Sequence, residues 1–129
     1  MGWRRATAPG ERGRDARRSR ERQGRHAEWI AALSLRLRGY RILGIREKTP
    51  LGEIDLIAVR GRRVAFVEVK RRATLEAAEA AISAAQRARI RSAASLWLAR
   101  NERYRTCELG FDIVFLIGGR WPRYIPNGL

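Results

Sequence analysis

Residues 52–72 read GEIDLIAVRGRRVAFVEVKRR, and this stretch decides the fold. Two β-prone runs, residues 53–59 and 64–70, lie on either side of the pair Gly61-Arg62. A two-residue loop with glycine in the first position is typical of a tight turn between antiparallel strands. The stretch therefore predicts a β-hairpin.

Counting outward from the loop gives the pairing of the two strands. If the two arginines that flank the loop face each other, Asp55 lies opposite Glu68 and Glu53 lies opposite Lys70, all on one face. The rest of this face is apolar and consists of Ile57, Val59, Val64 and Phe66. The opposite face is apolar throughout and consists of Ile54, Leu56, Ala58, Ala65, Val67 and Val69. A hairpin that is apolar on both sides is expected to be buried.

Facing carboxylates in a buried hairpin need a positive partner. Their Cβ atoms lie about 5 Å apart, and like charges at that distance destabilise a sheet unless a cation joins them. Mg²⁺ binds one or two carboxylates and keeps water and substrate phosphate as its other ligands. Lys70, roughly 6.6 Å along the strand from Glu68, can reach a phosphate or an attacking water. We therefore predict a metal and phosphate site at Asp55, Glu68 and Lys70, where Glu53 either holds Lys70 or adds a ligand. The alternative is a set of salt bridges at the rim of the sheet.

Periodic patterns around the hairpin predict one α/β domain, residues 25–129. Helical spacing of the apolar residues Trp29, Ile30, Leu33 and Leu37 indicates an amphipathic helix over residues 26–38. The other expected elements are a strand at 40–45, a long helix at 75–100, a strand at 111–117 and a short edge strand at 121–125. A right-handed crossover through the long helix makes the 111–117 strand parallel to the 64–70 strand. The order α-β-β-β-α-β then gives a mixed sheet with helices on its faces.

The charge balance indicates a polyanionic partner. The chain has 28 Lys and Arg residues against 13 Asp and Glu residues, a net charge of +15, which favours nucleic acid or an anionic membrane surface. No apolar run approaches the ~20 residues of a membrane span, and no secretory signal is evident, so a cytoplasmic protein is expected. Residues 1–24 contain eight arginines and are expected to form a flexible basic arm. Such an arm would strengthen phosphate binding, although a solvated tail of no function fits equally well.

Five further residues favour structural roles. The single Cys107 has no cysteine or histidine at ligand spacing and is expected to be a buried or half-buried thiol. His26 is expected on the helix surface, and Trp97 in the core together with Phe115. Asp112, at the start of an apolar strand, is expected to cap the end of the sheet rather than perform chemistry.

The hairpin, with the A-E-x-x-A helix and the G-Y-R-I-L segment before it, resembles the YraN-like family of uncharacterised bacterial proteins. That family is placed in the PD-(D/E)xK nuclease superfamily, near the archaeal Holliday-junction resolvases. The likeness spans about residues 24–127. It implies a restriction endonuclease-like α-β-β-β-α-β core, with Asp55 and Glu68 as ligands of Mg²⁺ or Mn²⁺ and Lys70 as the catalytic lysine. Glu28 matches a glutamate that often completes the metal site, although its place near the edge of the helix stripe also fits a solvated side chain.

Three departures from the family pattern bear on substrate handling. Gln86 stands where a lysine usually begins the basic stretch of the second helix, Gly110 replaces an arginine, and ATLEAAEA (73–80) replaces an aromatic-glycine segment. Gln86 can still support the site by donating a hydrogen bond. The arginines expected to contact nucleic acid are Arg71, Arg72, Arg87, Arg89 and Arg91.

The leading hypothesis is a Mg²⁺- or Mn²⁺-dependent endonuclease acting on DNA, with branched DNA suggested by the resemblance alone. A nucleic-acid-binding module that kept the fold without catalysis is the alternative, and an RNA-associated protein fits the basic arm equally well. The resemblance also permits a homodimer.

Overall fold

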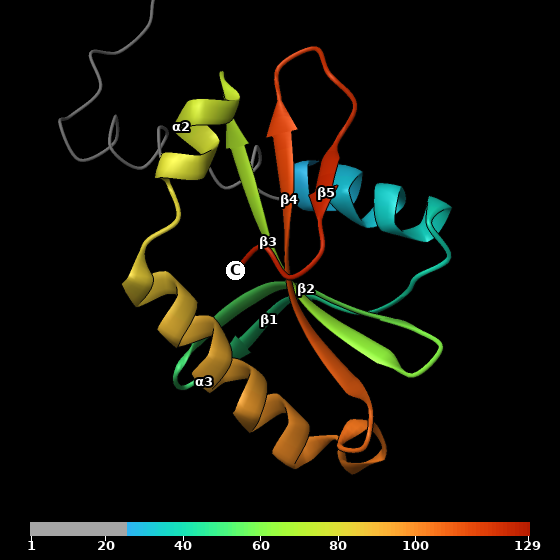
Figure 1. The fold of residues 1–129 in the computed structure, drawn as a ribbon. Helices are drawn as coiled ribbons and strands as arrows, with labels where there is room; N and C mark the ends of the chain where they lie inside the picture. The colour runs from blue at the N-terminus through green and yellow to red at the C-terminus, as the bar shows by residue number, and fades with distance from the viewer. Residues whose placement is uncertain (1–25) are drawn as a thin grey trace, which may run out of the picture.

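A five-stranded mixed sheet in the order β1-β2-β3-β4-β5 organises the protein, as the computed structural model shows (Figure 1). The structure describes residues 26–129, so the basic arm at 1–24 lies outside the described residues. The strands are β1 (Arg41–Thr49), β2 (Gly52–Arg60), β3 (Arg63–Arg72), β4 (Glu108–Ile117) and β5 (Arg123–Ile125). The helices are an N-terminal helix (26–37), α2 (Leu75–Ala80), α3 (Ala84–Arg100) and the 3₁₀ helix η1 (Glu102–Tyr104). This mixed α/β architecture is consistent with a restriction endonuclease-like core.

The hairpin between β2 and β3 has the predicted register. The recorded pairs run from Arg60 with Arg63 at the loop to Leu56 with Val67, as counting from the loop predicts. Beyond the loop, β3 pairs in parallel with β4 over its whole length, so the crossover expectation is also confirmed. One face assignment was wrong, because Ile54 packs in the cluster under α3 instead of on the opposite face.

The expected long helix at 75–100 is two helices. α2 ends at its cap Ala81, and α3 begins after Ser83, whose backbone is extended at φ −103° and ψ 160°. The Ser83 hydroxyl accepts a hydrogen bond from the Gln86 N–H at 3.1 Å, as an N-cap residue does. The alanine-rich pattern concealed this break, because helix propensity alone does not register a serine cap.

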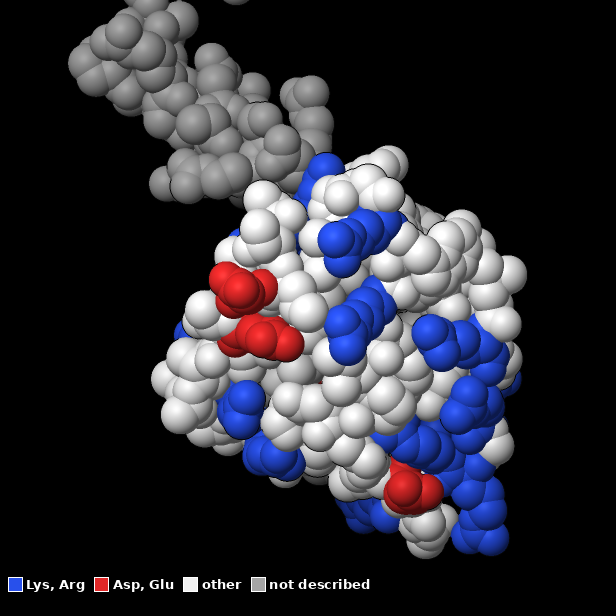
Figure 2. Space-filling model, turned by 45° about the horizontal axis from the view of Figure 1, so that its top comes forward, with Lys and Arg blue, Asp and Glu red and all other residues white. Residues whose placement is uncertain are grey.

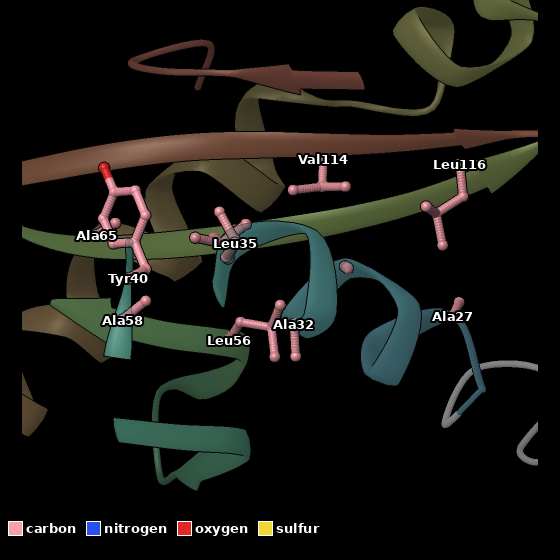
Figure 3. Packing of buried hydrophobic residues seen from close by; sticks show 11 residues of the cluster. Ala27, Ala32, Leu35, Tyr40, Leu56, Ala58, Ala65, Val114 and Leu116 are labelled. Carbon is pink, nitrogen blue, oxygen red and sulfur yellow. The ribbon is translucent and has the colours of Figure 1, made fainter. Parts of the chain in front are cut away.

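The N-terminal helix packs on the sheet through its small residues, so the predicted apolar stripe was not the buried face. Trp29, Leu33 and Leu37 are 57%, 56% and 66% exposed, and Ile30 is exposed as well. The buried helix residues are Ala27, Glu28, Ala31, Ala32, Ser34 and Leu35. Figure 3 shows the small side chains and Leu35 facing the sheet. Among the described residues, no helix is both long and apolar enough to cross a membrane.

The two faces of the sheet carry separate apolar clusters. The N-terminal helix covers Leu56, Ala58, Ala65, Val67, Val114 and Leu116 (Figure 3). α3 covers the other face through Ile90 and Trp97, the latter in edge contact with Phe66 at 5.8 Å between ring centroids. Trp97 and Phe115 are buried, as predicted; His26 is exposed and Cys107 is a half-buried free thiol, also as predicted.

Asp112 is fully buried inside β4, where it pairs with Val67, so its predicted place at the sheet end was wrong. The strand begins earlier than predicted, at Glu108. Both carboxylate oxygens of Asp112 accept hydrogen bonds from the Arg63 guanidinium, at 2.7 and 2.8 Å. Burial alone would raise the pKa of Asp112, but the hydrogen bonds from Arg63, Asn127 and Tyr124 lower it below its usual value. The predicted structural role of Asp112 agrees with this network.

Gly110 provides the room for this ion pair. A Cβ atom at Gly110 would lie 2.0 Å from the Arg63 Nη2 atom and 2.3 Å from its Cζ atom. Glycine at this position therefore accommodates a guanidinium that β3 supplies to Asp112.

Gly110→Ala should therefore destabilise the protein. The new methyl group would push Arg63 off Asp112 and leave a buried carboxylate short of its partner, a loss of roughly 3 kcal/mol. Denaturant unfolding measures the effect. The matched control is Gly118→Ala, since a Cβ there meets nothing within 4 Å. Equal stability of the two variants would show that Arg63 moves aside at no cost.

Candidate metal and phosphate site

A cleft of about 250 Å³ lies between β2, β3 and α3, away from the hairpin loop. The residues that line it are Gly52, Glu53, Asp55, Glu68, Gln86, Arg89 and Ile90. The predicted acid pair and the supporting Gln86 thus come together in one cleft.

Asp55 is positioned by a change in the β2–β3 pairing. The last recorded pair on this side is Leu56 with Val67, and the next free N–H of β3, that of Val69, donates to the Asp55 carboxylate at 2.8 Å. Burial and repulsion from Glu68 together raise the pKa of Asp55 to about 8, although the Val69 hydrogen bond lowers it in part. A carboxyl group in this setting favours either a proton or a nearby cation.

Glu28 completes an acidic cluster that we define as Glu28, Glu53 and Asp55. One carboxylate oxygen from each of the three residues lies within 4.8 Å of the others. Glu28 is only 7% exposed, so the interpretation of Glu28 as a solvated side chain was wrong. The helix directs it toward the sheet. Glu53, predicted as a supporting residue, lies within the group of potential ligands.

Lys70 is held at the edge of the cleft by two partners. Its Nζ atom lies 3.1 Å from the Glu68 Oε1 atom, and both side chains are largely buried. Gln86 contacts Lys70 when its amide is turned so that Oε1 accepts from Lys70 Nζ at 2.8 Å and Nε2 donates to the Ala81 carbonyl at 2.9 Å. This orientation makes two short hydrogen bonds, whereas the reverse one makes only a 3.4 Å contact with the Ser83 N–H. Glu68 thus interacts with both Lys70 and Asp55.

Arg46 is a residue of this region that the sequence reasoning missed. Its Nε atom lies 3.4 Å from Glu53 Oε1 and 3.6 Å from Glu28 Oε2, so its guanidinium adjoins the acidic cluster. The predicted strand ended at Ile45, one residue before it, whereas β1 continues to Thr49. In the sequence, the only sign that Arg46 could belong to the site was its place as a basic residue between the first strand and the G-E-I-D segment.

Basic side chains surround the domain. On the face drawn in Figure 2, Lys and Arg side chains are spread widely and gather along the lower right edge, while Asp and Glu form small patches. Of the arginines expected to contact nucleic acid, all five are exposed: Arg71, Arg72, Arg87, Arg89 and Arg91. Arg89 lines the cleft, whereas Arg91 lies 4.4 Å from the Phe111 ring centroid and donates to the Leu129 carbonyl. Arg89 is thus the best placed of them, and Arg91 has a structural partner.

The chemistry of the cluster fits a hard divalent cation. All its potential ligand atoms are carboxylate oxygens, which Mg²⁺ and Mn²⁺ prefer. Two of the three side chains are partly or fully withdrawn from water, and Glu68 adds a fourth carboxylate beside Asp55. Negative charges this close and this shielded favour a bound cation on electrostatic grounds.

Comparison with known proteins identifies relatives over most of the chain. The profile of the uncharacterised protein family UPF0102 matches residues 27–116. A UPF0102 protein of Chelativorans sp. (strain BNC1) is 52% identical over 118 residues, which cover 89% of this chain and 95% of that protein. A UPF0102 protein of Methylorubrum extorquens (strain PA1) is 51% identical over 111 residues, which cover 86% of this chain and 87% of that protein.

The raised pKa of Asp55 predicts an unusual pH dependence of stability in EDTA. Between pH 4 and pH 8 the folded protein keeps a proton on Asp55 that the unfolded chain releases, so stability should fall as pH rises through this window. The slope for one proton is at most about 1.4 kcal/mol per pH unit. Asp55→Asn imitates the protonated form, so it should match the wild type near pH 4 and exceed its stability at pH 8. Thermal unfolding at both pH values decides this, and an Asn variant that is less stable at pH 8 would contradict it.

Proposed function

Because this chain belongs to the uncharacterised protein family UPF0102, we propose its function from the geometry of its own site. The proposed function is that of a metal-dependent endonuclease that hydrolyses phosphodiester bonds in DNA. The observation that carries the proposal is the juxtaposition of clustered carboxylates with a buried lysine, Lys70, which contacts Glu68 in the wall of the same cleft. Each part alone is common on protein surfaces, whereas their combination matches the needs of phosphodiester hydrolysis.

The metal ligands would come from the two sides of the sheet. Glu28 from the N-terminal helix and Asp55 from β2 would hold the ion, with Glu53 or Glu68 completing the set. A bound Mg²⁺ or Mn²⁺ would lower the pKa of a coordinated water and offset charge on the phosphate. The cluster itself supplies the negative charge that selects such an ion over a monovalent one.

Lys70 would act on the phosphate. Its ammonium group lies at the edge of the same cleft, where an ion pair with Glu68 and a hydrogen bond to Gln86 fix its direction. A positive group that is already oriented stabilises the charge that develops on phosphate oxygens without reorganising during the reaction. Gln86, in the place of a lysine in the family pattern, would therefore orient Lys70 instead of contacting the DNA backbone.

DNA would bind through exposed arginines around the cleft. Arg89 lines the cleft, Arg87 lies two residues before it on α3, and Arg71 and Arg72 end β3 just beyond Lys70. Guanidinium groups bind phosphate oxygens bidentately and without regard to sequence. Binding should accordingly weaken steeply with salt. The preference for branched DNA, the homodimer and the cytoplasmic location stay predictions.

A nucleic-acid-binding module without catalysis is the second candidate. The observation in its favour is the 3.1 Å ion pair between Lys70 and Glu68, which engages both of these groups with each other. If this pair is permanent, the site lacks a free lysine for the reaction, while the exposed arginines outside the acidic cluster can still bind DNA.

A cleavage assay with an isosteric variant separates the two candidates. Purified protein is incubated with junction, flap, single-stranded and duplex DNA in Mg²⁺, Mn²⁺ or EDTA. Wild type should cleave at least one substrate in a metal-dependent manner, and Asp55→Asn should lower the rate about 100-fold or more. DNA affinity in EDTA should change little in this variant, because the arginines that bind DNA lie outside the acidic cluster.

Glu102→Gln is the matched control for that assay. It makes the same kind of acid-to-amide change at an exposed residue whose only recorded ion pair is with Arg105. Its cleavage rate should equal that of the wild type. Binding of every DNA by wild type in EDTA, with no cleavage in either metal, would reject the endonuclease and favour the binding module.

A further inference from the structure

Arg46 has a backbone conformation that L-amino acids rarely adopt. Its φ is 53°, and among the described residues the one other non-glycine residue with positive φ is Asn127. Asparagine tolerates this region, because its short polar side chain bonds locally, but arginine has no such compensation. The neighbours of Arg46 keep regular pairing with β2, since Ile45 pairs with Leu56 and Glu47 with Ile54. The strain is confined to one residue, and such strain persists where other contacts compensate for it.

The compensating contacts of Arg46 are with the acidic cluster. Its Nε atom donates to Glu53 Oε1 at 3.4 Å and lies 3.6 Å from Glu28 Oε2. One guanidinium thus reaches two of the three residues whose carboxylate oxygens lie within 4.8 Å of one another. The left-handed turn of the strand directs a long cationic side chain to the only group of acids that the fold brings together at this edge of the described domain.

Of the two partners, Glu28 differs from Arg46 in how freely its side chain can move. The Arg46 side chain is 32% exposed and that of Glu53 is 36% exposed, whereas the Glu28 side chain is only 9% exposed. Arg46 can therefore swing into solvent without breaking the core, and Glu28 cannot follow it. In the contact between Arg46 and Glu28, the mobile member is therefore the cation.

We propose that Arg46 is a resident counter-cation of the acidic cluster, which a divalent metal ion has to displace in order to bind. The inference rests on the proposed function, because it takes the cluster as the metal site. A guanidinium beside two ligand carboxylates competes with the metal for their oxygens and repels the ion by its charge. Arg46 therefore weakens metal binding while it compensates the acids whenever metal is scarce.

Isothermal titration of the full chain with Mn²⁺ alone tests this proposal. Arg46→Asn removes the guanidinium and keeps a residue that tolerates the left-handed conformation. Loss of one positive charge near a divalent ion should tighten Mn²⁺ binding roughly five- to tenfold. Arg46→Lys keeps the charge and should stay close to the wild type. The rise in melting temperature on adding Mn²⁺ should likewise be larger for Arg46→Asn than for the wild type.

Arg41→Asn is the matched control, because it removes an exposed arginine from the other end of the same strand, opposite Val59. Its Mn²⁺ affinity should stay within about twofold of the wild type. If the wild type binds Mn²⁺ and Arg46→Asn binds it equally or more weakly, Arg46 organises the ligands and the proposal is overturned while the metal site stands. If neither protein binds Mn²⁺, the metal site and the counter-cation role both fail. Tight binding by Arg46→Asn alone would support both.

Discussion

The ion pair between Arg63 and Asp112 ties the centre of the sheet together. Asp112 is fully buried, and its two oxygens receive the Arg63 guanidinium, the Asn127 N–H and the Tyr124 hydroxyl. Tyr124 in turn contacts the Tyr40 hydroxyl at 2.9 Å. The network therefore joins β3, β4, β5, the segment after β5 and the residue that precedes β1. A buried ion pair repays its desolvation only when its remaining hydrogen-bonding positions are satisfied, and here they are.

The same central strand carries the candidate site at its other end. Near Arg63, β3 is paired on both sides and satisfied, whereas at Val69 its N–H turns from the β2 backbone to the Asp55 side chain. This exchange of a ladder bond for a side-chain bond brings Asp55 close to Glu28 and Glu68. The end of β3 near Arg63, which is paired on both sides, anchors the strand. The polar end near Val69 can then hold charged side chains in place.

The hairpin and its acid pair were predictable because both depend on local rules. A two-residue loop and a period of two along each strand determine which side chains share a face, so Asp55 and Glu68 could be brought together by counting. The buried face of the N-terminal helix was not predictable, since large residues such as Trp29 stay exposed and small ones allow the helix to approach the sheet closely. The position of Arg46 could not be predicted either, because the direction of its side chain depends on a left-handed φ that no sequence pattern indicates.

Asp112 and Asp55 show how two acids in similar strands can differ in the partners that the fold provides. Both sit in strands with little access to water, yet Asp112 has a guanidinium and two further donors, so its pKa is lowered although burial opposes this. Asp55 has one N–H donor and acidic neighbours, so burial and repulsion raise its pKa to about 8. The negative charge of Asp112 is compensated by partners within the fold. The Asp55 carboxylate is stabilised by a proton or by a nearby cation, which is the electrostatic requirement of the proposed metal site.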